Sequence, residues 1–257
     1  MICMISVMLP RAAVSAERVD EVLKSETKIH DPKEPKTLPK NGKGEVAFEH
    51  VSFHYPGAEE DVLHDITFTA KPGETTAFIG STGCGKSTLV NLIPRFYDVT
   101  EGKITIDGQD VRDLTQHELR DKLGYVPQKG VLFSGNIASN IMFGNPAGSE
   151  QEMTEAAQIA QAVEFIDTKP ERYKSPISQG GANVSGGQKQ RLSIARAIAK
   201  HPDVYIFDDS FSALDYKTDT VLRSALKEKT TDSVVLIVAQ RISTILHAEQ
   251  IIVLDDG

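Results

Sequence analysis

Residues 80–88, Gly-Ser-Thr-Gly-Cys-Gly-Lys-Ser-Thr, have the composition and spacing of a phosphate-binding loop. Glycines let consecutive backbone N–H groups approach phosphate oxygens, and the helix that follows adds partial positive charge at its N-terminus. In this pattern the Lys86 ammonium reaches the β- and γ-phosphates, and the Ser87 hydroxyl binds Mg²⁺. The sequence therefore predicts a nucleoside triphosphate site whose contacts come from Ser81, Thr82, Gly83, Cys84, Gly85, Lys86, Ser87 and Thr88.

A second candidate group follows the apolar run Val204–Phe207, about 120 residues after the loop. Asp208 ends this run, and a carboxylate at the end of a buried strand holds Mg²⁺, usually through water, in phosphate-loop enzymes. We expect Asp208 and Ser87 to serve one metal ion. Asp209 comes next and places a second carboxylate beside the same site.

Composition limits what else the chain can do. Its 257 residues are 40% hydrophobic and 25% charged, which is ordinary for a globular protein, and its formal net charge of −8 argues against nucleic-acid binding. Two cysteines, Cys3 and Cys84, form no disulfide framework and suit a reducing compartment. No run of 18 apolar residues is present.

The elements that must position these residues alternate between strands and helices. Apolar periodicity predicts strands over 46–53, 66–70, 76–79, 104–108 (with its turn), 204–207, 234–239 and 251–254, and helices over 86–93 and 216–228. Capping boxes are predicted at Thr115 with Glu118, Ser149 with Glu152, and Ser185 with Gln188. This order indicates an α/β fold with a parallel sheet, and the mostly helical stretch of about 129–183 indicates an inserted subdomain.

Three regions are expected along the chain. Residues 1–24 begin apolar and continue as a helix, residues 25–44 are rich in Lys, Pro, Glu and Gly and indicate a linker, and 45–257 form the main domain. Asp255-Asp256-Gly257 follows the last strand as a hairpin signal. We expect both ends to be cuts from a longer polypeptide.

Asn183-Val184-Ser185-Gly186-Gly187-Gln188 resembles the LSGGQ signature of ATP-binding-cassette (ABC) proteins, with Val184 in place of leucine. A capped helix N-terminus with two glycines is a second anion site. The resemblance implies a P-loop NTPase core with a parallel sheet, an antiparallel β subdomain and the inserted helical subdomain. It also implies that ATP binds with Mg²⁺, and that Ser185, Gly186, Gly187 and Gln188 close over the nucleotide of a second such domain in a head-to-tail dimer.

Other positions match the cassette pattern in order. Tyr55 resembles the aromatic residue that stacks on adenine, Gln128 resembles the Q-loop glutamine that touches Mg²⁺, and Ser212–Asp215 resembles the D-loop. The runs at 95–98, 135–137 and 241–245 resemble fused bacterial multidrug or lipid exporters. That subtype implies a transmembrane domain in the same polypeptide, of which 1–24 is the last helix end, and a place on the cytoplasmic face of the cell membrane. A cassette ATPase outside transport is the alternative.

Two positions depart from the family pattern. Asp209 stands where the family has a glutamate as general base, and Gln240 stands where it has the switch histidine. The catalytic candidates are thus Asp209, Gln240, Lys86 and Gln128. The paired change resembles the degenerate half of a heterodimeric exporter, whose own site turns over slowly. A homodimer that tolerates both residues, and a nucleotide-gated dimerisation module with little turnover, are the alternatives.

Overall fold

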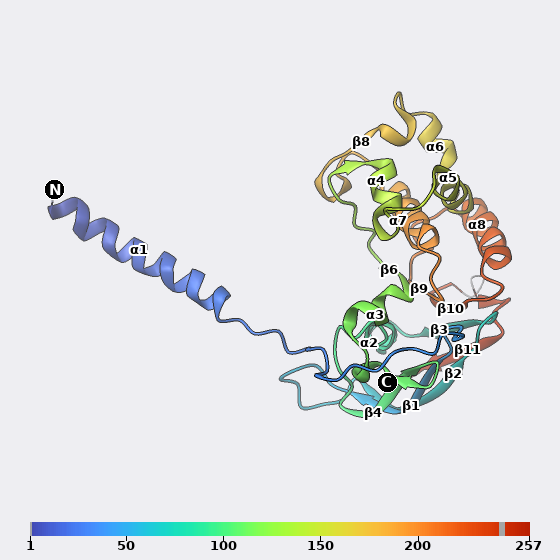
Figure 1. The fold of residues 1–257 in the computed structure, drawn as a ribbon, viewed down its shortest axis with the longest axis horizontal. Coiled ribbons are helices and arrows are strands. Elements are labelled where there is room, and N and C mark those ends of the chain that lie inside the picture. The colour runs from blue at the N-terminus through green and yellow to red at the C-terminus, as the bar shows by residue number, and fades with distance from the viewer. Residues whose placement is uncertain (1, 242–244) are drawn as a thin grey trace. The chain divides into compact units, whose positions relative to one another are not determined.

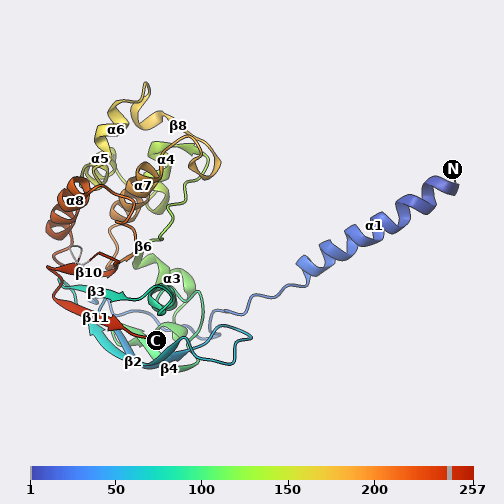
Figure 2. The same cartoon turned by 180° about the vertical axis from the view of Figure 1, so that it is seen from behind.

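The computed structural model describes residues 2–241 and 245–257, which fall into two units, 1–30 and 31–257. In the first unit, α1 (Ile2–Leu23) is one helix of 22 residues that contains Pro10. Figures 1 and 2 show this helix as a ribbon, and its side chains from Val7 onward are exposed. Within the described residues, no helix combines the length and the apolar character needed to cross a membrane. The assignment of 1–24 to the end of a membrane helix stays a prediction.

A five-stranded parallel sheet forms the centre of the second unit, in the order β11-β3-β10-β9-β6. Its strands are β3 (Thr75–Gly80), β6 (Leu123–Val126), β9 (Val204–Asp208), β10 (Val234–Val238) and β11 (Gln250–Leu254). Every residue of β9 and β10 is buried, as expected for central parallel strands. The predicted α/β class with a parallel sheet is confirmed, whereas β6 was not predicted as a strand.

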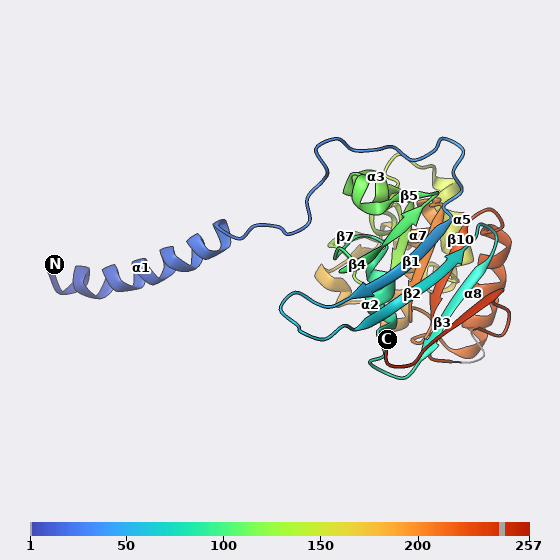
Figure 3. The ribbon, with the colours of Figure 1, turned by 90° about the horizontal axis from the view of Figure 1, so that it is seen from below.

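An antiparallel sheet lies beside this core, in the order β2-β1-β4-β5 (Figure 3). Its strands are β1 (Val46–Phe53), β2 (Leu63–Ala70), β4 (Glu101–Ile106) and β5 (Gln109–Asp110). Phe48 of β1 pairs with Phe68 of β2 and with Ile104 of β4, so one strand joins both neighbours. The antiparallel β subdomain implied by the family resemblance is confirmed.

The core consists of two apolar layers separated by the parallel sheet. Alternate side chains of β9 enter different layers: Val204 and Ile206 pack with the antiparallel sheet, whereas Tyr205 and Phe207 pack with the helical part of the chain. This follows from the two-residue period of a strand. Helices α2 (Lys86–Leu92), α3 (Gln116–Asp121) and α8 (Tyr216–Lys229) complete the two layers.

The helical subdomain contains α4 (Ile137–Ile141), α5 (Glu150–Ile159), α6 (Val163–Asp167) and the start of α7 (Gly186–Ala199). The capping boxes at Ser149 and Ser185 form as predicted. Two short strands, β7 (Gly135–Asn136) and β8 (Pro176–Ile177), pair antiparallel and join the ends of this subdomain. Short 3₁₀ turns occur at Val111–Asp113, Met142–Gly144, Arg172–Lys174 and Gln179–Gly181.

The capping box predicted at Thr115 is only half formed. The Thr115 side chain accepts the Glu118 N–H, but the Glu118 carboxylate accepts the backbone N–H of Leu38 at 2.9 Å instead of reaching back to Thr115. The predicted second half is therefore wrong, because a distant segment takes the carboxylate. That segment, residues 31–45, has almost no regular structure of its own but is hydrogen-bonded along its length to the main domain.

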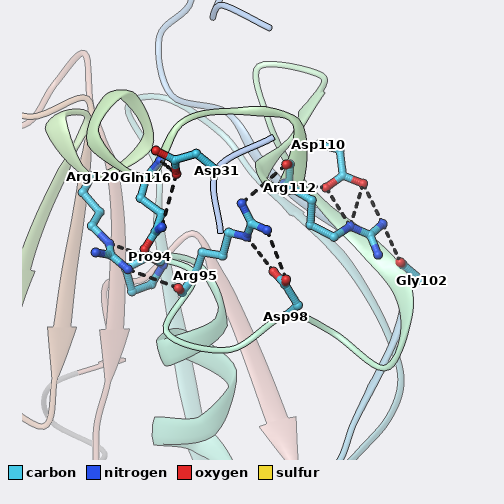
Figure 4. A network of polar contacts seen from close by, with 9 residues as sticks. All are labelled: Asp31, Pro94, Arg95, Asp98, Gly102, Asp110, Arg112, Gln116 and Arg120. Carbon is cyan, nitrogen blue, oxygen red and sulfur yellow. Dashed lines mark hydrogen bonds and ion pairs between the residues drawn. The ribbon is translucent and has the colours of Figure 1, made fainter. Parts of the chain in front are cut away.

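Figure 4 shows the contact of this segment with the start of α3, together with the polar contacts of the loop after α2. Asp31 accepts hydrogen bonds from the backbone N–H (2.9 Å) and side-chain amide (3.2 Å) of Gln116 at the start of α3. Nearby, Arg95, only 6% exposed, binds Asp98 at 2.6 Å, and Arg120 of α3 donates to the carbonyl of Arg95. The exporter-like run 95–98 thus holds the end of α2 against α3.

Candidate functional site

The phosphate-loop motif forms a strand–loop–helix unit, in which Gly80 ends β3 and Lys86 begins α2. Gly80, Gly83 and Gly85 have φ angles of 154°, 91° and 94°, a region that favours glycine. A Cβ on Gly80 would lie 2.2 Å from the carbonyl oxygen of Leu254, whereas one on Gly83 would meet nothing within 4 Å. Gly80 is thus required by packing, while Gly83 leaves open space above the loop.

Lys86 lies under this loop and is 8% exposed. Its Nζ donates to the carbonyl oxygens of Gly80 at 2.9 Å and Ser81 at 2.6 Å, and lies 3.4 Å from Sγ of Cys84. These bonds place a positive charge inside the loop. Cys84 is buried below it, so its side chain lines the loop from the protein side.

A cavity of about 210 Å³ opens above the loop. Its lining brings together predicted residues from four separate segments, with Val238 added: Thr82, Gly83, Gly85, Lys86, Ser87, Thr88, Gln128, Asp209, Val238 and Gln240. A larger cavity, about 440 Å³, lies along α8 and β10 and contains none of the predicted residues. We place the site at the smaller cavity, because there Lys86 and Ser87 of the phosphate loop meet the carboxylate of Asp209.

Two of the three predicted metal residues, Ser87 and Asp208, are in contact, and Ser87 lines this cavity. The Ser87 hydroxyl donates to Asp208 Oδ1 at 2.8 Å, although 121 residues separate them in the chain. Burial raises the pKa of Asp208 and the nearby Asp209 charge adds to the rise, while the Ser87 hydrogen bond opposes it. Hydroxyl and carboxylate oxygens are ligands that Mg²⁺ prefers, so this pair fits that ion.

Other ligands for Mg²⁺ would come mainly from phosphate and water. Among the described residues, no cluster of three or more His, Cys, Asp or Glu side chains could hold a metal ion. Mg²⁺ commonly binds through one or two protein groups plus substrate phosphates, so such a cluster is not needed. Gln128 is the third predicted metal residue, and its amide nitrogen donates a hydrogen bond to Asp209 at 3.2 Å. Its carbonyl oxygen is therefore the atom that could bind a metal ion.

The two residues that depart from the family pattern, Asp209 and Gln240, are in direct contact. Oδ2 of Asp209 accepts hydrogen bonds from Nε2 of Gln240 at 2.8 Å and from Nε2 of Gln128 at 3.2 Å. Asp209 is 7% exposed and has a φ of 48°. Its backbone is fixed by a bond from its N–H to the carbonyl of Val238 at 3.1 Å. The carboxylate is therefore held in one position by two amide donors.

Tyr55 lies beside the loop but outside the cavity. Its hydroxyl is 2.8 Å from the Thr88 hydroxyl in α2, and its ring makes edge contacts with Phe53 and Tyr97 at centroid distances of 5.1 and 5.2 Å. The ring is half-buried. Its neighbours fix it near the N-terminal end of α2, and its stacking on adenine stays a prediction.

The signature residues lie apart from this cavity. Ser185 caps α7 by accepting the N–H of Gln188 at 3.3 Å, and the Gln188 side chain accepts the Ser185 N–H at 3.1 Å. Ser185 and Gly186 are exposed. The chain's own loop and its own signature therefore do not form one site within this structure.

Sequence reasoning missed two polar residues that support the site. Ser210 donates to the carbonyl of Val126 at the end of β6, at 2.8 Å, and Gln190 of α7 contacts the backbone on both sides of Gln128. Both are buried polar residues, and Gln190 follows the signature by only two positions. For Gln190, its position just after the signature was the signal in the sequence that could have pointed to such a role.

Comparison with known proteins agrees with this geometry. A family model described as "ABC transporter" matches residues 63–212. An "Uncharacterized ABC transporter ATP-binding protein" of Mycobacterium tuberculosis is 46% identical over 253 residues, covering 97% of this chain and 43% of that protein. A "Putative multidrug export ATP-binding/permease protein" of Staphylococcus aureus is 45% identical, covering 83% and 37%.

A solved structure shares the fold. The chain superimposes on one described as "Structure of a bacterial Atm1-family ABC exporter with ATP bound", with a TM-score of 0.89 and 34% identity, over 99% of this chain and 44% of the other. The chain thus spans less than half the length of the relatives it matches. Sequence, fold and site agree, and the chain belongs to the ABC transporter family.

Proposed function

We propose that this chain is the ATP-binding and ATP-hydrolysing domain of an ABC exporter, and that its own site hydrolyses ATP slowly. The observation that carries the second part is the hydrogen bond from Gln240 to Asp209 at 2.8 Å. In the complete transporter, the domain acts with a transmembrane domain of the same polypeptide at the cytoplasmic face of the membrane. Nucleic acid is not among its partners.

ATP binding depends on residues that are all present. Backbone N–H groups of the loop and the Lys86 ammonium bind the β- and γ-phosphates, and Tyr55 offers a face or edge to the adenine. Ser87 and Asp208 hold Mg²⁺, with Gln128 as a further oxygen donor. When bound, Mg²⁺ neutralises charge on the β- and γ-phosphate oxygens. Affinity for Mg-ATP should therefore survive the changes at Asp209 and Gln240.

The hydrolytic step depends on Asp209 and Gln240. An aspartate carries its carboxylate about one bond length further back than a glutamate, and a misplacement of about 1 Å can cost on the order of 100-fold in rate. General-base assistance is worth about 10²–10⁴-fold. Gln240 donates to the carboxylate but can neither carry a proton nor become a cation. We expect slow turnover rather than none.

The intact signature gives the chain a second role. Ser185–Gln188 form a capped helix N-terminus in which Ser185 and Gly186 are exposed, and none of the four residues lines the cavity above the phosphate loop. Partial positive charge at that terminus suits a phosphate of another domain's ATP. This chain thus completes its partner's site, and we propose that the partner is a different half-transporter with glutamate and histidine at the two altered positions.

The test is the double variant Asp209→Glu with Gln240→His in the full-length chain assembled with its native partner. Steady-state ATPase is measured with the partner's own site inactivated, so that only this chain's site reports. We expect a rise of about 10²-fold over the unaltered chain, from the base contribution given above. Turnover equal to that of the unaltered chain would refute the slow-site proposal.

One observation favours a second candidate, a nucleotide-gated dimerisation module with little turnover of its own. Both donors on Asp209 Oδ2 are neutral amides, so neither can relay a proton. ATP-dependent dimerisation, followed by light scattering with ATP or ADP, discriminates the two. Association with ATP that persists for many minutes favours the module, whereas association that decays as ADP forms favours the slow enzyme.

A further inference from the structure

The segment that carries Gln128 is anchored by its backbone at two places, one on each side of that residue. Its first anchor is the carbonyl of Val126, which accepts the hydroxyl of Ser210 at 2.8 Å, and Ser210 itself is fully buried. Its second anchor is Gln190, 2% exposed, in the second turn of α7. Gln128 and Lys129, between the anchors, are exposed.

Gln190 uses both ends of its amide on this segment. Its Oε1 accepts the N–H of Gly130 at 3.1 Å, and its Nε2 donates to the carbonyl of Pro127 at 3.2 Å. One buried side chain thus bonds the backbone immediately before and two residues after Gln128. No simple apolar side chain could replace it without leaving a buried donor and acceptor unpaired.

Packing reinforces this contact. A Cβ on Gly130 would lie 2.9 Å from the Ser193 hydroxyl and 3.0 Å from the Lys189 carbonyl, so the loop backbone rests directly on α7. Gln128 in turn reaches Asp209 at 3.2 Å. A continuous path of short contacts therefore runs from α7 through Gln190 and Gln128 to the carboxylate beside the nucleotide cavity.

The same helix begins at the signature. Ser185 and Gln188 form a reciprocal capping box, which fixes the first turn of α7, and Gln190 follows in the next turn. We propose that Gln190 is a positioning residue that ties the signature helix to the Q-loop, so that the reach of Gln128 toward Mg²⁺ and Asp209 depends on where α7 lies. This rests on the proposed function, because it makes occupancy of the partner's site, through the signature, a determinant of this chain's own site.

The test begins with Gln190→Met, which keeps the length of the side chain and removes both hydrogen bonds. Residue-resolved hydrogen exchange on the 257-residue chain should show the Gly130 amide exchanging about tenfold faster, the effect of one lost hydrogen bond. Ser193→Ala is the matched control, because it alters the same face of α7 at Gly130 but removes no recorded bond to the loop. We expect its exchange at Gly130 to stay within about twofold of the unaltered chain.

The second readout is one that a purely structural role would leave unchanged. ATP affinity is measured with Mg²⁺ and with chelator, and the ratio gives the gain due to the metal. In Gln190→Met this gain should fall about tenfold, as found for residues that orient metal ligands, while affinity without metal stays the same. Gln128→Ala sets the gain expected when the positioned side chain is absent.

The outcomes are distinct. Unchanged exchange at Gly130 in Gln190→Met, or faster exchange with an undiminished metal gain, would overturn the proposal. If the unaltered chain bound no ATP, the proposed function would fail, while the exchange measurement would still decide whether Gln190 holds the loop. Should Gln190→Met fold poorly, Gln190→Glu replaces it, since it keeps an acceptor for Gly130 but loses the donor to Pro127; exchange and metal gain indistinguishable from the unaltered chain would again overturn the proposal.

Discussion

The side-chain amide of Gln240 donates to Oδ2 of Asp209 at 2.8 Å, so the two residues that depart from the family pattern bind each other. Their effects should therefore not be independent. We expect Gln240→Leu and Asp209→Ala, each of which removes one partner of the bond, to show a coupling of about 1 kcal/mol in the free energy of unfolding, because bonded neighbours are non-additive. Urea unfolding of both single variants and the double variant measures it. Additive effects within about 0.3 kcal/mol would show that the bond does not stabilise the fold.

Asp208 predicts a pH dependence of stability. Because burial raises the pKa of the Asp208 carboxyl in the folded chain above its ordinary value, its ionisation at higher pH opposes folding. The stabilisation that protonated Asp208 contributes is complete below its pKa in the unfolded chain. It is lost as the pH rises through its pKa in the folded chain. Asp208→Asn should thus increase the free energy of unfolding at pH 7 in the absence of Mg²⁺, since the amide oxygen still accepts the Ser87 bond.

The measurement is urea unfolding of both proteins from pH 3.5 to pH 7. The difference between them should grow with pH and be smallest at the acidic end, where Asp208 is mostly protonated in both states. Equal stability across the whole range would contradict the raised pKa. Addition of Mg-ATP should stabilise the unaltered chain more than the variant, because a charged carboxylate binds Mg²⁺ more strongly than a neutral amide oxygen.

Ser87 predicts the metal dependence of nucleotide binding. Its hydroxyl lies 2.8 Å from Asp208 Oδ1, at the cavity above the loop. Ser87→Ala should reduce the gain in ATP affinity due to Mg²⁺ about tenfold, with little change when the metal is chelated. Thr220→Ala, which removes an exposed hydroxyl on α8, is the control and should leave the gain unchanged.

Much of the site was predictable from sequence because its chemistry is local. The phosphate loop is nine consecutive residues between a strand and a helix, and Asp208 ends an apolar strand, so spacing alone located both. The phosphate loop and Asp208 lie close together because the carboxyl ends of parallel strands lie at the same edge of a sheet. At this edge Val238 of β10 pairs with Asp208 of β9. The contact of Gln240 with Asp209 depends in addition on a φ of 48° at Asp209, which no pattern encodes.

The parts that escaped prediction rest on contacts between distant segments. β6 is a four-residue strand interrupted by Gly124, where a Cβ would lie 2.6 Å from Pro202, so close packing rather than propensity defines it. β7 and β8 are two residues each and carry no periodic signal. The composition of 25–44 indicates a linker, yet the bonds from Lys36 and Leu38 to the α3 region come from partners about 80 residues away.

Arg196 connects α7 to other parts of the helical subdomain, and we expect these contacts to contribute to the free energy of unfolding. Its guanidinium donates to Asn140 O at 2.8 Å and to Val131 O at 2.9 Å, and lies 5.1 Å above the Phe133 ring. Burial lowers its pKa to about 10, so it stays charged at pH 7. Arg196→Lys keeps the charge but loses the planar fork, and should cost about 2 kcal/mol in urea unfolding. A cost below about 0.5 kcal/mol would show that charge alone matters there.

Asp107 binds the segment before β1, and we expect its carboxylate to protect the amides of residues 43–45 from hydrogen exchange. Its carboxylate accepts the backbone N–H groups of Lys43 at 3.1 Å, Gly44 at 3.0 Å and Glu45 at 3.0 Å, and its own N–H donates to the Glu45 carbonyl at 2.8 Å. Asp107→Ala removes the three side-chain bonds and leaves an alanine at a φ of 49°, a backbone conformation that aspartate tolerates better. We expect amides 43–45 to exchange at least tenfold faster, because each bond to a charged group is worth about 1.5–3 kcal/mol.

Asp107→Asn provides the matched comparison, since asparagine tolerates the left-handed backbone and keeps one acceptor oxygen. Its exchange should fall between those of the unaltered chain and Asp107→Ala. The nucleotide cavity lies on other elements, so ATP affinity should stay the same in both variants. If exchange at 43–45 rose equally in Asp107→Asn and Asp107→Ala, the charge of the carboxylate rather than its geometry would hold the segment. If it rose in neither, the segment would be held from its other end, through Asp31 and Lys36.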